Sequence, residues 1–204
     1  ALNGSGSASV TIVAGAANNA AITGYEYDLN ASGSWISTGS TATTFNVGSL
    51  TNGVQYALRV RAINAVGSSL ASASSNLTAL AAATGGSATS GSAVLNLSWT
   101  AVAGATGYSV SYSTSSSTGF VQATGACSAP TTTNCALSGL TVGSAYYFKV
   151  TALNGSGSAP ASAAFGPTTV LQIASVSGTP TLSGAFSIGS TITASESGLT
   201  ISGY

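Results

Sequence analysis

The stretch LTVGSAYYFKVTALN, residues 140–154, decides the fold, because apolar side chains recur at every second position from Tyr146 onward. This alternation is typical of a β-strand with one buried face, since successive side chains of a strand point to opposite faces. A second copy, LTNGVQYALRVRAIN, occupies residues 50–64, one small-domain length earlier in the chain. The chain therefore contains an internal repeat.

A second pair of matching segments lies upstream of each copy. ITGYEYDL at residues 22–29 aligns with ATGYSVSY at residues 105–112, and both alternate large apolar residues with small or polar ones. Gly-, Ser- and Asn-rich turns separate the apolar runs, and no long stretch has the 3.6-residue period of a helix. The sequence predicts an all-β protein.

These segments in combination resemble the fibronectin type III family, with Gly-Tyr-x-Val-x-Tyr on strand C and Leu-x5-Tyr on strand F. The resemblance implies tandem fibronectin type III/immunoglobulin-like β-sandwiches. It also implies two tyrosine corners, a packing feature formed by Leu50 with Tyr56 and by Leu140 with Tyr146. The strand B pattern LNLSW ends at Trp99, which is expected to fill the middle of a sandwich.

The repeats predict three parts: an incomplete unit at residues 1–82, a complete unit at 85–168, and a partial unit or intersubunit strands at 169–204. The first unit has almost nothing upstream of residue 10 to form strand A. Residues 175–204 instead read as strands A and B and the opening of strand C of a further unit. Either the sequence is a window of a longer array, or the surplus strands of one subunit complete the next subunit.

The few charged residues include a set that the resemblance places on paired strands. Glu26 and Asp28 on strand C are expected to face outward, opposite Arg59 and Arg61 on strand F, as a cross-strand ion ladder. Two carboxylates on one strand face are also a possible glycosidase pair, but their cationic partners favour the ladder. We therefore predict no catalytic residue.

The composition excludes several partners. Charged residues make up 3% of the chain and the net charge is zero, against about 25% charged residues in typical domains. Three scattered cations argue against nucleic acid, and no apolar run reaches the roughly 18 residues of a membrane-spanning helix. A surface without charge repulsion favours self-association.

The two cysteines, Cys127 and Cys135, flank a Ser/Pro/Thr-rich loop, and we favour a disulfide over two free thiols. The chain has no His, so neither a zinc site nor a nucleophile activated by His is supported. Acidic residues do not cluster in the sequence as calcium requires. No cofactor and no metal are expected.

These observations predict a non-enzymatic extracellular or cell-surface protein, with bacterial origin as a further expectation. Its expected role is a subunit or segment of a self-associating fibre, sheath or stalk, whose partners are head-to-tail copies of itself or neighbouring repeats. The alternative is a spacer or carbohydrate-contacting module of a secreted polysaccharide-degrading enzyme or large adhesin. Glycans are candidate partners because Trp35 and Tyr147 could stack on sugar rings, although packing under a neighbouring loop is the competing interpretation.

Overall fold

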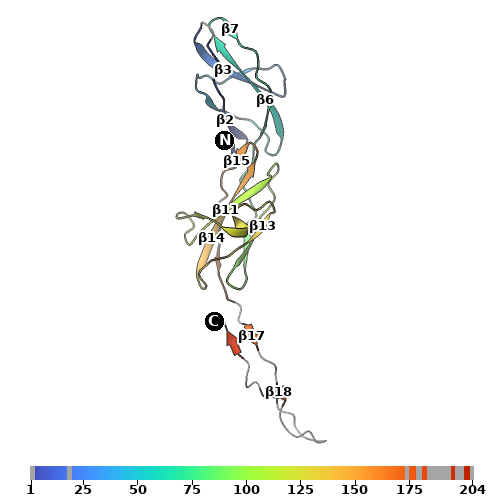
Figure 1. Cartoon of the computed structure of the whole chain (residues 1–204), viewed down its shortest axis with the longest axis vertical. Coiled ribbons are helices and arrows are strands. Elements are labelled where there is room, and N and C mark those ends of the chain that lie inside the picture. The colour runs from blue at the N-terminus through green and yellow to red at the C-terminus, as the bar shows by residue number, and fades with distance from the viewer. Residues whose placement is uncertain are drawn as a thin grey trace.

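The computed structural model describes residues 3–17, 20–172, 175–177, 181–182, 194–195 and 200–202. Two β-sandwich units follow one another along the long axis, and short paired strands of the C-terminal segment lie beyond them (Figure 1). Within the described residues the single helical element is a 3-10 turn, η1, at Gly125–Cys127. The predicted all-β sandwich class is confirmed.

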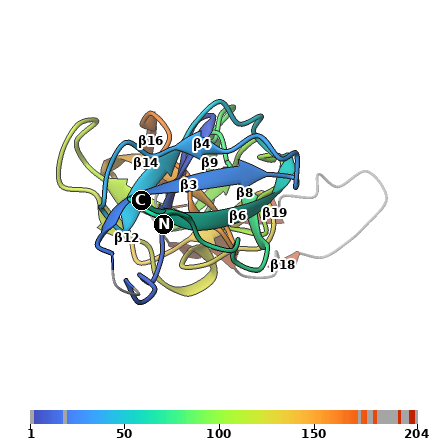
Figure 2. The ribbon, with the colours of Figure 1, turned by 90° about the horizontal axis from the view of Figure 1, so that it is seen from above.

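The first unit contains two antiparallel sheets. One has the order β1-β2-β5, and the other has the order β4-β3-β6-β7 with β8 paired to β6. Figure 2 shows β3 and β6 side by side. The strands are β1 Asn3–Gly4, β2 Ser7–Thr11, β3 Ile22–Leu29, β4 Ile36–Ser37, β5 Thr44–Val47, β6 Gln55–Asn64, β7 Gly67–Ser68 and β8 Ser75–Thr78.

The second unit repeats this plan with one fuller sheet. Its sheets have the orders β13-β10-β9 and β12-β11-β14-β15, and β16 pairs with β14. The strands are β9 Ser87–Ser90, β10 Leu95–Ser98, β11 Gly107–Ser113, β12 Val121–Gln122, β13 Asn134–Leu137, β14 Ala145–Asn154, β15 Gly157–Ser158 and β16 Phe165–Thr169.

Each unit has its own core, built from the inward positions of the alternating strands. The first core includes Tyr27, Val47, Leu58 and Leu77, and the second core is larger and includes Trp99. Trp99 is 5% exposed and meets the ring of Tyr108 edge-on, with ring centroids 5.3 Å apart. The unit boundaries at 82 and 85 stay a prediction.

A tyrosine corner closes the turn before the long strand in both units. The Tyr56 hydroxyl accepts a hydrogen bond from the Thr51 N–H at 3.0 Å, and the Tyr146 hydroxyl accepts one from the Thr141 N–H at 3.2 Å. The leucine that precedes each turn, Leu50 or Leu140, is buried. This geometry gives both tyrosines a packing role in the fold.

The C-terminal segment contributes two short strand pairs. β17 Ser175–Ser177 pairs with β20 Thr200–Ser202, and β18 Thr181–Leu182 pairs with β19 Ala194–Ser195. The rest of the strands predicted between residues 175 and 204 lies outside the described residues.

Candidate functional site

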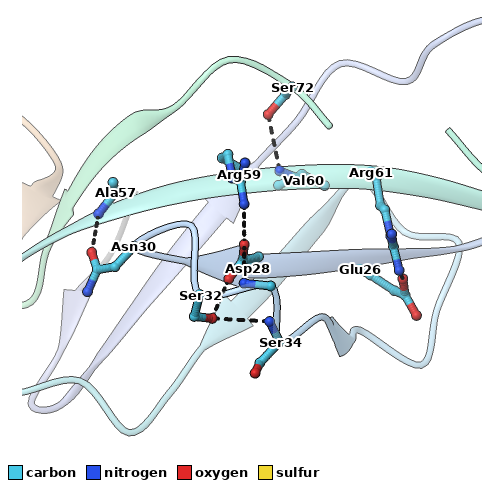
Figure 3. Close-up of polar contacts among 11 residues, drawn as sticks. Glu26, Asp28, Asn30, Ser32, Ser34, Ala57, Arg59, Val60, Arg61 and Ser72 are labelled. Carbon is cyan, nitrogen blue, oxygen red and sulfur yellow. Dashed lines mark hydrogen bonds and ion pairs between the residues drawn. The ribbon is translucent and has the colours of Figure 1, made fainter. Parts of the chain in front are cut away.

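The charged residues of the first unit lie on two neighbouring strands, β3 and β6. The strand register places Glu26 opposite Arg61 and Asp28 opposite Arg59. Arg61 Nη2 lies 2.6 Å from Glu26 Oε2, and Arg59 forms an ion pair and a hydrogen bond with the Asp28 carboxylate (Figure 3). The indole of Trp35 covers both guanidinium groups. Its ring centroid lies 4.2 Å from Cζ of Arg61 and 5.6 Å from Cζ of Arg59.

Asp28 differs from the prediction because its side chain is fully buried, although strand alternation predicts an outward-facing, exposed position. The turn after β3 folds back over it. Ser32 Oγ donates to Asp28 Oδ1 at 2.6 Å (Figure 3). The Gly33 N–H donates to Asp28 Oδ2 at 3.3 Å. Strand alternation alone could not reveal this covering turn.

The surroundings of Asp28 keep it ionised. The Ser32 hydroxyl has the largest effect and lowers the pKa of Asp28, while burial opposes it. The Arg59 guanidinium and the Gly33 N–H also lower this pKa. A carboxylate held in its charged form by three donors suits a structural ion pair, whereas a general acid requires a raised pKa.

The second unit has a simpler version of the same arrangement. Lys149 lies on β14 opposite Ser111, and its ammonium group sits 4.3 Å from the ring centroid of Phe120. Phe120 directly precedes β12, just as Trp35 directly precedes β4. An aromatic residue therefore covers a cation of the long strand in both units, which was not predicted from the sequence.

The two cysteines form a disulfide between η1 and β13, with Cα atoms of Cys127 and Cys135 5.3 Å apart. Cys127 is fully buried in the second core. Among the described residues there is no group of three or more His, Cys, Asp or Glu side chains that could hold a metal ion. In the same part of the chain no helix is long and apolar enough to cross a membrane.

The turn between β14 and β15 joins the two units. Ser156 Oγ accepts a hydrogen bond from the Thr78 N–H at 3.2 Å and donates to the Asn76 carbonyl at 3.4 Å. Asn154 Nδ2 donates to the Thr78 carbonyl at 3.2 Å and to the Gly104 carbonyl at 3.3 Å. The bonds to Thr78 and Asn76 connect the first unit to this turn, and the bond to Gly104 ties the turn to another loop of the second unit, so the junction is hydrogen-bonded rather than a free linker.

The edge of β2 is the feature that most distinguishes the first unit from the second. β2 and β10 are equivalent, because Ala8 pairs with Val47 of β5 in the way that Leu95 pairs with Leu137 of β13. In the second unit β9 pairs with all four residues of β10. In the first unit β1 pairs only with Ser7 and Ala8. The outer edge of Ser9–Thr11 carries no strand among the described residues.

An apolar groove of about 450 Å³ lies beside this open edge. Val10, Tyr25, Leu58 and Val60 line it from the sheets, and Leu70 lines it from the segment after β7. Leu70 is 94% exposed. An exposed leucine beside a hollow between two sheets is typical of a surface that another chain covers.

A family model and solved structures of other proteins are similar to parts of the chain. Residues 83–167 match the family model of the Fibronectin type III domain. A solved structure of an Fn3-like protein from Clostridium thermocellum shares 32% identity, covering 40% of this chain and 84% of that chain, with a TM-score of 0.37. The chicken CNTN1 FN1–FN3 domains share 18% identity over 86% of this chain and 68% of that chain, with a TM-score of 0.35. No curated protein matches the chain.

The strand orders and the tyrosine corners define a tandem β-sandwich protein of the immunoglobulin-like class. With the family match, the chain is identified as one built of fibronectin type III-like repeats, and residues 83–167 are a fibronectin type III domain. Domains of this family are generally non-catalytic modules.

Acidification tests the state of Asp28. A lowered folded-state pKa stabilises the first unit above the ordinary aspartate pKa of about 3.9, and this stability is lost as the pH falls through the folded value. We expect Ser32→Ala to move the loss to higher pH, because it removes the strongest donor to Asp28, whereas Ser34→Ala should leave it unchanged. The indole NMR signal of Trp35 during thermal unfolding at several pH values measures this, and equal profiles for both variants would contradict the assignment.

Exchange of one side chain tests the junction. Ser156→Val places there the residue type found at the corresponding turn position of the first unit, Val66, and removes two hydrogen bonds worth about 1 kcal/mol each. We expect the relative orientation of the units to vary more widely, which broadens the distance distribution from small-angle X-ray scattering. Val66→Ser is the matched control, and an unchanged distribution for Ser156→Val would show that these bonds do not hold the joint.

Proposed function

We propose that the chain is a non-enzymatic extracellular structural protein that self-associates head to tail into a fibre, sheath or stalk, with strand addition between subunits as the contact. The open edge of β2 is the observation that carries this proposal. A sheet edge with unpaired N–H and C=O groups is a template for pairing with another strand. A contact between unlike surfaces of identical subunits propagates into a filament unless its rotation closes a ring.

The charge distribution supports association between copies. Edge strands in natural proteins are commonly protected by charged side chains, above all Lys. Here Lys149 lies under Phe120 in the second unit, and the two arginines are held in the ladder under Trp35. No charged side chain occurs between residues 1 and 25, so β2 has no charge of its own to repel a partner strand.

The disulfide favours the extracellular location in this proposal. Disulfides persist in oxidising compartments, and the Cys127–Cys135 bond ties a loop to the core of the second unit. A secreted or surface location is consistent with a neutral coat rich in Ser, Thr and Gly.

The alternative is a spacer within a larger secreted enzyme or adhesin, and the hydrogen-bonded junction favours it, because a rigid joint suits a module that holds other domains apart. In that case we expect isolated copies of the chain to stay monomeric. The two proposals therefore differ in solution behaviour.

Electron microscopy of the full chain over a range of concentrations tests the proposal. We expect filaments from the full chain and dispersed particles from a version that lacks residues 173–204 and keeps Leu171, which is hydrogen-bonded to Ser90 and Ala93. Circular dichroism establishes that both versions are folded. Dispersed particles from both versions at every concentration would contradict self-association and favour the spacer.

A further inference from the structure

We propose that the groove beside β2 is a strand-acceptor site, and that its occupant is strand β17 of a second copy, with Val176 seated in the groove. This inference rests on the proposed self-association and specifies its two contacting elements. The second unit shows the geometry that the first unit lacks, because there β9 lies along the equivalent edge and contributes Ala88 opposite Leu97.

The residue that faces the added strand is smaller in the first unit than in the second. The second unit places the large Leu97 opposite the small Ala88, and both pack in or against its core. At the equivalent position the first unit has the smaller Val10, which leaves room for a side chain larger than alanine. Val176 in the pattern Ser-Val-Ser is such a side chain, and a Val–Val pair has six side-chain carbons where Ala–Leu has five.

The rim of the groove carries exposed apolar side chains, as expected of a surface that another chain covers. Val13 is 97% exposed and Leu70 is 94% exposed, and both line the groove. Tyr25 and Leu58 on its floor are buried residues of the central strands. A strand laid along β2 therefore meets backbone groups on one side and apolar side chains along one face, as β-strand addition requires.

The donor strand is available in the C-terminal segment. β17 pairs with β20 alone among the described residues, in a sheet of two strands. A two-stranded sheet is marginally stable in water without further strands or packing. Addition of β17 to β2 extends that sheet and completes the first unit of the partner at the same time.

The arrangement of the chain makes the donor a second copy. The first unit and the C-terminal strands lie at opposite ends of the molecule, with the second unit between them (Figure 1). The hydrogen bonds of the junction hold the units in this extended order. β17 therefore reaches the groove of a neighbour, and each added copy exposes a new β17 at the growing end.

A complementation experiment tests the site. Leu70→Arg blocks the acceptor at a residue that is already 94% exposed, and Val176→Asp blocks the donor. The matched controls are Val66→Arg, at an 87% exposed residue outside the groove lining, and Ser177→Asp, at the next residue of the same strand. Analytical ultracentrifugation measures the association of the full-length chains, and circular dichroism establishes that each is folded.

We expect each blocked variant to associate about 100-fold more weakly than the unmodified chain, because it puts a charge into an apolar contact. Mixed together, the two blocked variants should form a 1:1 dimer that grows no further, since one functional acceptor meets one functional donor. Both controls should associate like the unmodified chain.

The outcomes separate this inference from the proposed function. If the unmodified chain polymerises and the blocked variants polymerise equally well, self-association stands and the assignment of groove and β17 is overturned. A mixture of blocked variants that stays monomeric also overturns it. If the unmodified chain itself stays monomeric at every concentration, both proposals fail.

Discussion

The requirement that backbone N–H and C=O groups in a sheet find partners determines how the two units differ. In the second unit β9 satisfies the whole edge of β10, whereas in the first unit β1 satisfies only the beginning of β2. The five charged residues that the structure describes lie on β3, β6 and β14 and none lies on β2, while Arg61, which also lines the groove, is paired with Glu26. The open edge of β2 and the exposed Leu70 lie on the same groove.

The charged residues stabilise each unit internally. Asp28 is buried and can remain ionised because Ser32, Gly33 and Arg59 all donate to it. Its pairing with Arg59 fixes the register of β3 against β6, since a slip of one residue would place the carboxylate on the opposite face. The second unit has Ser111 and Lys149 at the corresponding register and depends instead on a larger core and a disulfide. The same sandwich is thus stabilised by different interactions in its two copies.

Much of this architecture follows from local sequence patterns. The alternation around Tyr56 and Tyr146 predicts the two long strands β6 and β14. Features that depend on loops were not predictable, because loop paths leave no periodic signal. The turn that buries Asp28 and the contact between Lys149 and Phe120 are of this kind. The docking of Ser156 on the first unit depends in addition on how two domains meet.

Amide hydrogen exchange at β2 tests the central claim most directly. The Ile12 N–H donates to the carbonyl of Thr43, which directly precedes β5, so by alternation the N–H groups of Ser9 and Thr11 point to the open edge. We predict rapid exchange of these two amides in dilute monomer and strong protection in assembled material, with Asn96 and Ser98 of β10 protected in both. Ser9 and Thr11 amides that are equally protected in monomer and assembly, or that stay unprotected in the assembly, would contradict the open edge as the assembly contact.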